Sequence, residues 1–213
     1  ARLNSEMAEV AVDAGLAEAT ADFRSIAALD SHFTALRADL IANADLFLLV
    51  GKGEDDSPFP AGKLKVRDDP RFHRYAVNVV VTQPDGDAEG APVVVETLPT
   101  LSNLTGRIDY TPIQGALLTD FTMIRSGALH RANGGFLIVD ARRVLSEPLA
   151  WDALKRCLET ASVHVITAED RLGLISTTTL EPEPIPLDVR VVLVGDRMLH
   201  LLLSQYDPDF SEH

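Results

Sequence analysis

The first fifty residues carry apolar side chains at helical spacing. Intervals of three and four positions place one set on a single helix face: Leu29, Phe33, Leu36, Leu40, Ala44, Phe47 and Leu48. Asp30 or Ser31 is suited to cap this helix. The alanine-rich stretch before it predicts a second helix, packed as a hairpin. Residues 1–50 are therefore predicted to be a helical appendage or insertion. A partner-binding coiled coil is the alternative, although sustained heptads are missing.

Residues 51–73 break this periodicity with glycine and proline and are predicted to be a linker. Alternating valines then predict a strand at 74–81, and a second strand follows at 91–96. The valine run 93–95 is continuously apolar, which is typical of a strand covered on both faces.

The second half of the chain alternates between apolar runs and helical patterns. After an irregular, glycine-rich stretch, the pattern predicts strands at 136–140 and 189–194, helices at 149–158 and 197–205, and a hairpin from 163–167 and 172–180. Strands that alternate with helices indicate an α/β fold with a mostly parallel sheet.

Composition narrows the function classes. The net charge of −13 and the pI near 4.8 argue against nucleic acid as a partner, because phosphate binding needs clustered Lys and Arg. The single cysteine, Cys157, excludes an intrachain disulfide framework and fits a reducing, cytoplasmic location. No apolar run is long enough to cross a membrane. The start at Ala1 and the end at His213 suggest a piece of a longer protein.

Two acidic residues follow predicted strands. Asp140 ends the strand at 136–140, and Asp196 follows the strand at 189–194. In a parallel sheet the carboxyl ends of the strands form the ligand crevice, and P-loop NTPases place a magnesium-side acid there. The alternative for each residue is that it caps the following helix.

The phosphate cradle that such acids would serve is missing from the sequence. A P-loop reads G-x-x-x-x-G-K-[ST], and the fragments around Lys52 and Lys63 lack the required glycine and hydroxyl positions. The histidines show no metal-ligand spacing, and no G-x-S-x-G elbow occurs. Cys157 falls within an apolar helical pattern and is interpreted as a core thiol.

An ordered series of motifs resembles one protein family. The motifs are PTLSNLTGRI at 99–108, GALLTDF at 115–121, GALHRANGG at 127–135, PLAWDALKR at 148–156, LEPEPIPLDV at 180–189 and YDPDF at 206–210. Together they resemble the AAA+ region of the Lon-related ATP-dependent proteases of bacteria, close to the LonB and LonC types. The resemblance is strong over about half of the chain and weaker upstream.

The resemblance implies a partial AAA+, P-loop NTPase-like core at 74–213, taken from a hexameric ring protease that uses ATP and Mg²⁺. Asp140 would be the Walker B acid on the magnesium side, and Asp196 would lie at the sensor-1 position. Two departures suggest a degenerate ATPase: Ala141 replaces the usual glutamate, and Asp196 replaces the usual asparagine. The phosphate loop would lie upstream of this chain, and the Ser–Lys dyad downstream.

Residues 107–129 would form the loop that such modules send toward the ring's pore. Tyr110, Phe121 and Met123 are then candidates for gripping unfolded protein substrates, and the alternative is that they pack inside the module. The expected function is ring assembly and polypeptide threading in a Lon-like serine protease, with this chain inactive by itself. A non-catalytic scaffold or adaptor is the main alternative, and an active nucleotide switch is a third.

Overall fold

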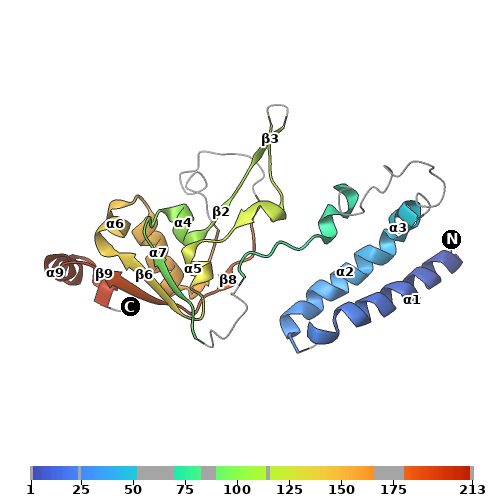
Figure 1. Ribbon diagram of the computed structural model, residues 1–213, viewed down its shortest axis with the longest axis horizontal. Coiled ribbons are helices and arrows are strands. Elements are labelled where there is room, and N and C mark those ends of the chain that lie inside the picture. The colour runs from blue at the N-terminus through green and yellow to red at the C-terminus, as the bar shows by residue number, and fades with distance from the viewer. Residues whose placement is uncertain are drawn as a thin grey trace. The chain divides into compact units, whose positions relative to one another are not determined.

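The computed structural model describes residues 2–23, 25–51, 70–82, 90–113, 116–165 and 180–211. The chain divides into two units, 1–76 and 77–213 (Figure 1). The linker positions 52–69, which include Lys52 and Lys63, lie outside the described residues.

The first unit is helical, as predicted, but the single helix expected from Leu29 to Leu48 is divided into η2 Ala27–Leu29, α2 Asp30–Ala42 and α3 Ala44–Gly51. Helices α1 and α2 pack as a hairpin, and a bidentate ion pair joins them, with Arg37 Nη2 2.9 Å from Asp13 Oδ2. The predicted capping residues, Asp30 and Ser31, lie inside α2. Leu29 takes the N-cap position instead, and no side chain caps the helix there. The elements are α1 Arg2–Ala19, η1 Ala21–Phe23, η2 Ala27–Leu29, α2 Asp30–Ala42, α3 Ala44–Gly51 and η4 Pro70–Tyr75.

Phe47, Phe72 and Tyr75 form an aromatic cluster in this unit. The rings of Phe47 and Phe72 lie 5.0 Å apart, and Tyr75 is 5.7 Å from Phe47. The Tyr75 hydroxyl donates to Asp39 Oδ2 at 2.7 Å. Burial, together with this hydrogen bond to a carboxylate, raises the pKa of Tyr75 to about 12. Tyr75 therefore serves as a neutral hydrogen-bond donor.

The second unit is built on a three-stranded parallel sheet in the order β1–β6–β9 (Figure 1). Its strands are β1 Val93–Glu96, β6 Phe136–Asp140 and β9 Arg190–Val194, which confirms the predicted mostly parallel α/β fold. One face of the sheet is packed by helices, and this core includes Leu104, Leu129, Leu137, Val139, Val144, Leu154 and Val163. Among the described residues, no helix is both long and apolar enough to span a membrane.

The helices of the second unit are short. They are α4 Leu101–Thr105, α5 Ala128–Arg131, α6 Ala141–Ser146, α7 Ala150–Glu159, α9 Arg197–Tyr206 and η6 Pro208–Ser211. Four further strands and a short helix form the segment between α4 and α5: β2 Arg107–Ile108, β3 Thr111–Ile113, β4 Ala116–Leu118, η5 Phe121–Met123 and β5 Ile124–Arg125.

Two sequence predictions are wrong. Residues 77–82 form no strand, because the alternating valines find no strand to pair with, and Val77 is 85% exposed. The valine run in β1 is covered on one face only, since Val93 and Val95 are more than half exposed. Strand β7 Ser162–Val163 pairs antiparallel with β8 Ile185–Pro186, and most of the hairpin predicted from 163–167 and 172–180 lies outside the described residues.

A polar cluster fastens the carboxyl-terminal segment to α7. Lys155 Nζ lies 3.0 Å from both carboxylate oxygens of Asp207 and 2.9 Å from Asp209 Oδ2. Trp151 Nε1 donates to Asp207 Oδ2 at 2.7 Å. The side chains of Lys155 and Asp207 are only 17% and 15% exposed, so neither charge can be left unpaired without a desolvation cost.

His130 on α5 is a second buried polar group. It is 4% exposed, and its Nδ1 accepts a hydrogen bond of 3.2 Å from the Gly127 N–H. Its Nε2 has no hydrogen-bond partner among the described residues. Burial, assisted by the charge on Arg131, lowers the pKa of His130 below 6.5. The folded protein therefore holds this imidazole neutral.

We predict that Asp207→Ala lowers the free energy of unfolding by about 2 kcal/mol, because it leaves Lys155 and the Trp151 indole N–H under-satisfied. Urea unfolding followed by fluorescence measures this directly, since Trp151 is the only tryptophan in the sequence. The control is Glu159→Ala, an exposed acid at the end of α7, which should change stability by less than about 0.5 kcal/mol. Equal effects of the two substitutions would contradict the assigned role of the cluster.

We predict that the protein loses stability through His130 as the pH falls below about 6.5. The unfolded chain then takes up a proton that the folded state resists, because a protonated Nδ1 cannot accept from Gly127. His130→Asn keeps an acceptor and removes the titration. Urea midpoints between about pH 7.5 and pH 5.5 should fall more steeply for the wild type than for His130→Asn. Parallel slopes would show that His130 does not contribute.

Candidate functional site

A hairpin arm projects from the second unit between α4 and α5 (Figure 1). Strands β2 and β5 pair antiparallel at its base, and β3 and β4 pair antiparallel further out. Between the two ladders the ascending limb has two residues, 109–110, whereas the descending limb has five, 119–123. The longer limb takes up its extra residues in η5, so the arm bends there as a bulged hairpin does.

Two glycines allow the limbs to cross where the arm leaves the core. Gly106 has φ +87°, and a Cβ on it would lie 2.5 Å from the Arg125 carbonyl oxygen. A Cβ on Gly127 would lie 2.2 Å from the Leu104 carbonyl oxygen. Any side chain at either position would force the limbs apart. Just beyond the crossing, Ile108 is 5% exposed and anchors the base of the arm in the core.

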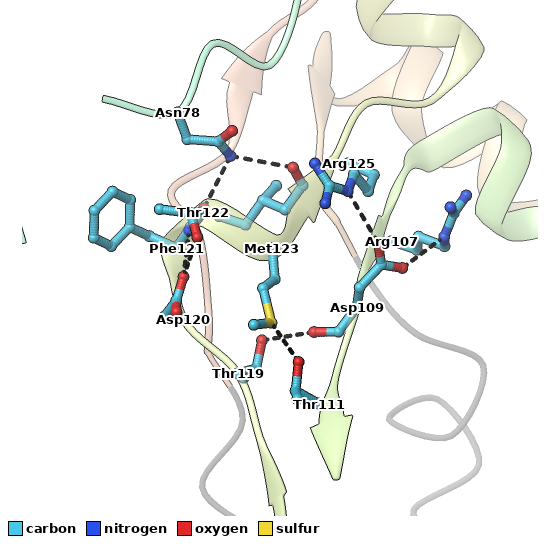
Figure 2. A network of polar contacts seen from close by, with 11 residues as sticks. Asn78, Arg107, Asp109, Thr111, Thr119, Asp120, Phe121, Thr122, Met123 and Arg125 are labelled. Atoms are coloured by element: carbon cyan, nitrogen blue, oxygen red, sulfur yellow. Dashed lines mark hydrogen bonds and ion pairs between the residues drawn. The ribbon is translucent and has the colours of Figure 1, made fainter. Parts of the chain in front are cut away.

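Polar contacts brace the arm above this crossing (Figure 2). Asp109 accepts from Arg107 Nε and from Arg125 Nε, each at 2.9 Å. These two guanidinium groups lower the pKa of Asp109, Arg125 making the larger contribution, so the carboxylate stays charged. The backbone of Asp109 also bonds the other limb, since its N–H donates to the Met123 carbonyl and its carbonyl accepts from the Thr119 hydroxyl.

The bend in the descending limb has its own contacts. Asp120 caps η5 by accepting from the Thr122 N–H at 2.8 Å. Asn78, from the segment that enters this unit, donates to the carbonyl oxygens of Phe121 and Ile124 at 2.9 and 3.1 Å (Figure 2). The arm is therefore a braced element with a defined bend.

Apolar side chains are exposed along the arm. Leu117 is 66% exposed and Leu118 is 51% exposed, both on β4, and Tyr110 is 38% exposed. The other two sequence candidates lie in the bend and are half-buried. Met123 Sδ is 3.8 Å from the Thr111 hydroxyl, whereas the Phe121 ring points away from this network (Figure 2). All three candidates thus belong to the arm, and Leu117 and Leu118 are the most exposed large apolar side chains among those that the structure describes there.

The two acidic candidates lie at the carboxyl edge of the parallel sheet. Asp140 Oδ1 accepts from the Arg143 N–H at 2.9 Å and caps α6, and Asp196 Oδ1 accepts from the Leu199 N–H at 2.8 Å and caps α9. The sequence thus places both acids at the same sheet edge, and each also fulfils the alternative role of a helix cap.

Asp196 has a second partner at this edge. Its Oδ2 accepts from Arg142 Nη2 at 2.8 Å, so both carboxylate oxygens are engaged. The backbone bond to Leu199, then the Arg142 guanidinium, lower the pKa of Asp196. An open cleft of about 360 Å³ lies between α6 and α9, and Arg142, Asp196, Met198 and Leu202 contribute to its lining. No group of three His, Cys, Asp or Glu side chains in the described part of the chain is arranged to hold a metal ion.

Sequence reasoning missed Leu117, Leu118, Asp109 and Arg142. A signal existed for the first three. Gly115, which lies between two apolar stretches, predicts a turn and therefore a hairpin that carries Leu117 and Leu118. Arg107 and Asp109 are two positions apart, so in an extended segment their side chains lie on the same face. Arg142 had no signal, because its partner is 54 positions away.

Comparisons with known proteins agree with this geometry. The family described as LonB-like, AAA domain matches residues 89–213, more than half of the chain. The "Putative Lon protease homolog" of Escherichia coli (strain K12) is 31% identical over 94 residues, which are 42% of this chain and 14% of that protein. The chain thus matches only a small part of that relative's length.

A structural comparison is weaker. The crystal structure of NtrX from Brucella abortus matches with a TM-score of 0.35 and 18% identity, over 56% of this chain and 24% of that one, which is too low to define a shared fold. The family match is the decisive finding, because it covers the parallel sheet, the arm and the strand-end acids. The chain belongs to the LonB-like AAA domain family and is an AAA-type domain related to the Lon proteases.

Proposed function

We propose that the chain is the module of a Lon-like, ATP-dependent serine protease that engages and threads unfolded polypeptide. The observation that carries this proposal is the projecting arm with Leu117 and Leu118 exposed on one short strand. Exposed apolar side chains that gather on one element mark an interaction site. An apolar grip suits unfolded chains, because every unfolded protein presents apolar side chains irrespective of its sequence.

The family suggests oligomeric assembly, and a ring is the arrangement that we propose. A hexameric ring would direct one arm from each copy toward a common axis, so that several weak apolar contacts act together on one polypeptide. Tyr110, Phe121 and Met123 would contribute from the lower part of the arm, and Leu117 and Leu118 would make the first contact. The peptidase, with its Ser–Lys dyad, would belong to the remainder of the protein.

AAA-type domains typically bind ATP. A magnesium–nucleotide site at the carboxyl edge needs free acidic oxygens and a phosphate loop. Asp140 ends β6 as a magnesium-side acid would, but Asp196 is fully engaged by Arg142 and the Leu199 N–H. No phosphate loop occurs in the sequence. These residues do not form an ATP site by themselves, so no hydrolytic step is assigned to this chain.

This engagement of Asp196 favours the second candidate function, a non-catalytic AAA-derived scaffold or adaptor. A scaffold would retain the fold and the capped helices and would dispense with nucleotide turnover. The two candidates differ in the arm, because a scaffold has no need to capture unfolded chains.

We predict that Leu117→Ser with Leu118→Ser weakens capture of a permanently unfolded, casein-like polypeptide by about tenfold, the loss expected when roughly 1.4 kcal/mol of apolar contact is removed. Fluorescence anisotropy of the labelled polypeptide measures the affinity. Val77→Ser is the matched control, because it removes an 85% exposed apolar side chain outside the arm and should leave binding unchanged. Wild-type affinity in the double variant would refute the arm's role and favour the scaffold.

We predict that the purified chain releases no phosphate from ATP in the presence of Mg²⁺ and does not cleave casein. For ATP the physical reason is the missing phosphate cradle and the engagement of Asp196 by Arg142, and for casein it is that the proposed Ser–Lys dyad belongs to the remainder of the protein. A coupled phosphate assay and gel analysis of casein check these outcomes. Magnesium-dependent phosphate release that disappears in Asp140→Asn would overturn the first expectation and support the nucleotide switch.

A further inference from the structure

The base of the arm contains an unfavourable pair that a third residue compensates. Arg107 and Arg125 are directly opposite each other in the β2–β5 ladder. Like charges at such positions repel and destabilise an antiparallel pair. Both arginines nevertheless send their Nε donors to one carboxylate, Asp109, which lies two residues beyond Arg107 and therefore on the same face of the strand (Figure 2).

We propose that Asp109 is the positioning residue of the arm. Its carboxylate bridges Arg107 on one limb and Arg125 on the other, converts a repulsive pair into a +/−/+ triad, and so fixes the direction in which Leu117 and Leu118 are presented. Asp109 acts on the conformation of the arm. The effect of that conformation on substrate capture rests on the proposed function.

The triad acts locally rather than on the stability of the whole protein. The side chains of Arg107, Arg125 and Asp109 are 54%, 52% and 39% exposed, and ion pairs that are this exposed contribute little to global stability. The ladder that they brace is only two residue pairs long. Where so few other contacts hold an element, a weak interaction decides between its closed and its open form.

The backbone of Asp109 also contacts the opposite limb of the arm. Its N–H and carbonyl bond Met123 and Thr119, so it contacts the descending limb through both its main chain and its side chain. Loss of the carboxylate leaves these backbone bonds in place. The substitution Asp109→Asn therefore isolates the electrostatic contribution.

The first experiment measures amide hydrogen exchange across the arm in the full chain. In Asp109→Asn we expect exchange at residues 108–113 and 116–125 to become about tenfold faster, with exchange in β6 and α7 unchanged. Glu159→Gln, which removes one negative charge at an exposed site on α7, should match the wild type. Circular dichroism and Trp151 fluorescence confirm that each variant is folded.

Two further variants separate repulsion from a general structural effect. Asp109→Asn combined with Arg125→Gln removes the opposed charges and should restore most of the protection, whereas Asp109→Glu should keep it. Salt gives an independent signature. Raising the ionic strength should slow exchange in Asp109→Asn by screening the two arginines, and should leave the wild type unchanged or speed its exchange slightly.

The outcomes distinguish this inference from the proposed function. Wild-type exchange in Asp109→Asn, or failure of Arg125→Gln to rescue it, overturns the role of Asp109. If exchange rises and is rescued as expected, the positioning role stands, and polypeptide affinity is then measured on the same variants. Unchanged affinity in a loosened arm would count against the arm as the capture element and would leave the positioning role intact.

Discussion

Strand β6 lies between β1 and β9, and the parallel pairing of these three strands places the other elements of the second unit. Its inward side chains, Leu137 and Val139, are at most 1% exposed and form the surface on which the helices pack. Because all three strands run in the same direction, their carboxyl ends share one edge, and Asp140 and the residues after Val194 arrive there together. The single hydrophobic face therefore determines both the core and the position of the acidic residues.

The same packing supports the arm. Helix α5 buries Leu129 and His130 in the core, and the imidazole accepts a hydrogen bond from the Gly127 N–H, next to the close approach of the two limbs at Gly106 and Gly127. From this crossing the arm extends outward with its own contacts, most of them polar. The apolar core thus supports the base of the arm, while the polar network fixes the conformation of its two limbs. Substitutions in the core affect its packing, whereas changes of charge or ionic strength affect the polar network.

The strand-end acids show how a structural and a functional role can share one residue. An aspartate after a buried strand is suited to cap the next helix, and the same position faces the ligand crevice of a parallel sheet. In this chain Asp140 and Asp196 both cap, and Asp196 is in addition neutralised by Arg142. The capping role accounts for an acid at each of these two positions without requiring that it bind a cation.

The sequence alone determined the elements whose signal is local. Apolar spacing identified the helices of the first unit, the valine-rich and leucine-rich runs identified β1, β6 and β9, and the series of motifs identified the family. Periodicity is sufficient in these cases because side-chain burial repeats with the geometry of the element itself. The two wrong predictions, the strand at 74–81 and the double-sided cover of β1, both concern which segment pairs with or covers another.

Only the tertiary structure decided those partners. It showed that 107–113 and 116–125 form a projecting arm, that Leu117 and Leu118 are exposed on it, and that Asp109 joins two opposed arginines. It also gave Asp196 a partner 54 positions away. Such contacts form between residues that are far apart in the sequence, and neither apolar spacing nor composition specifies which residues will meet. The same charged or apolar residue is equally compatible with solvent, a helix cap or a distant partner. Only the tertiary fold brings one of these partners within reach.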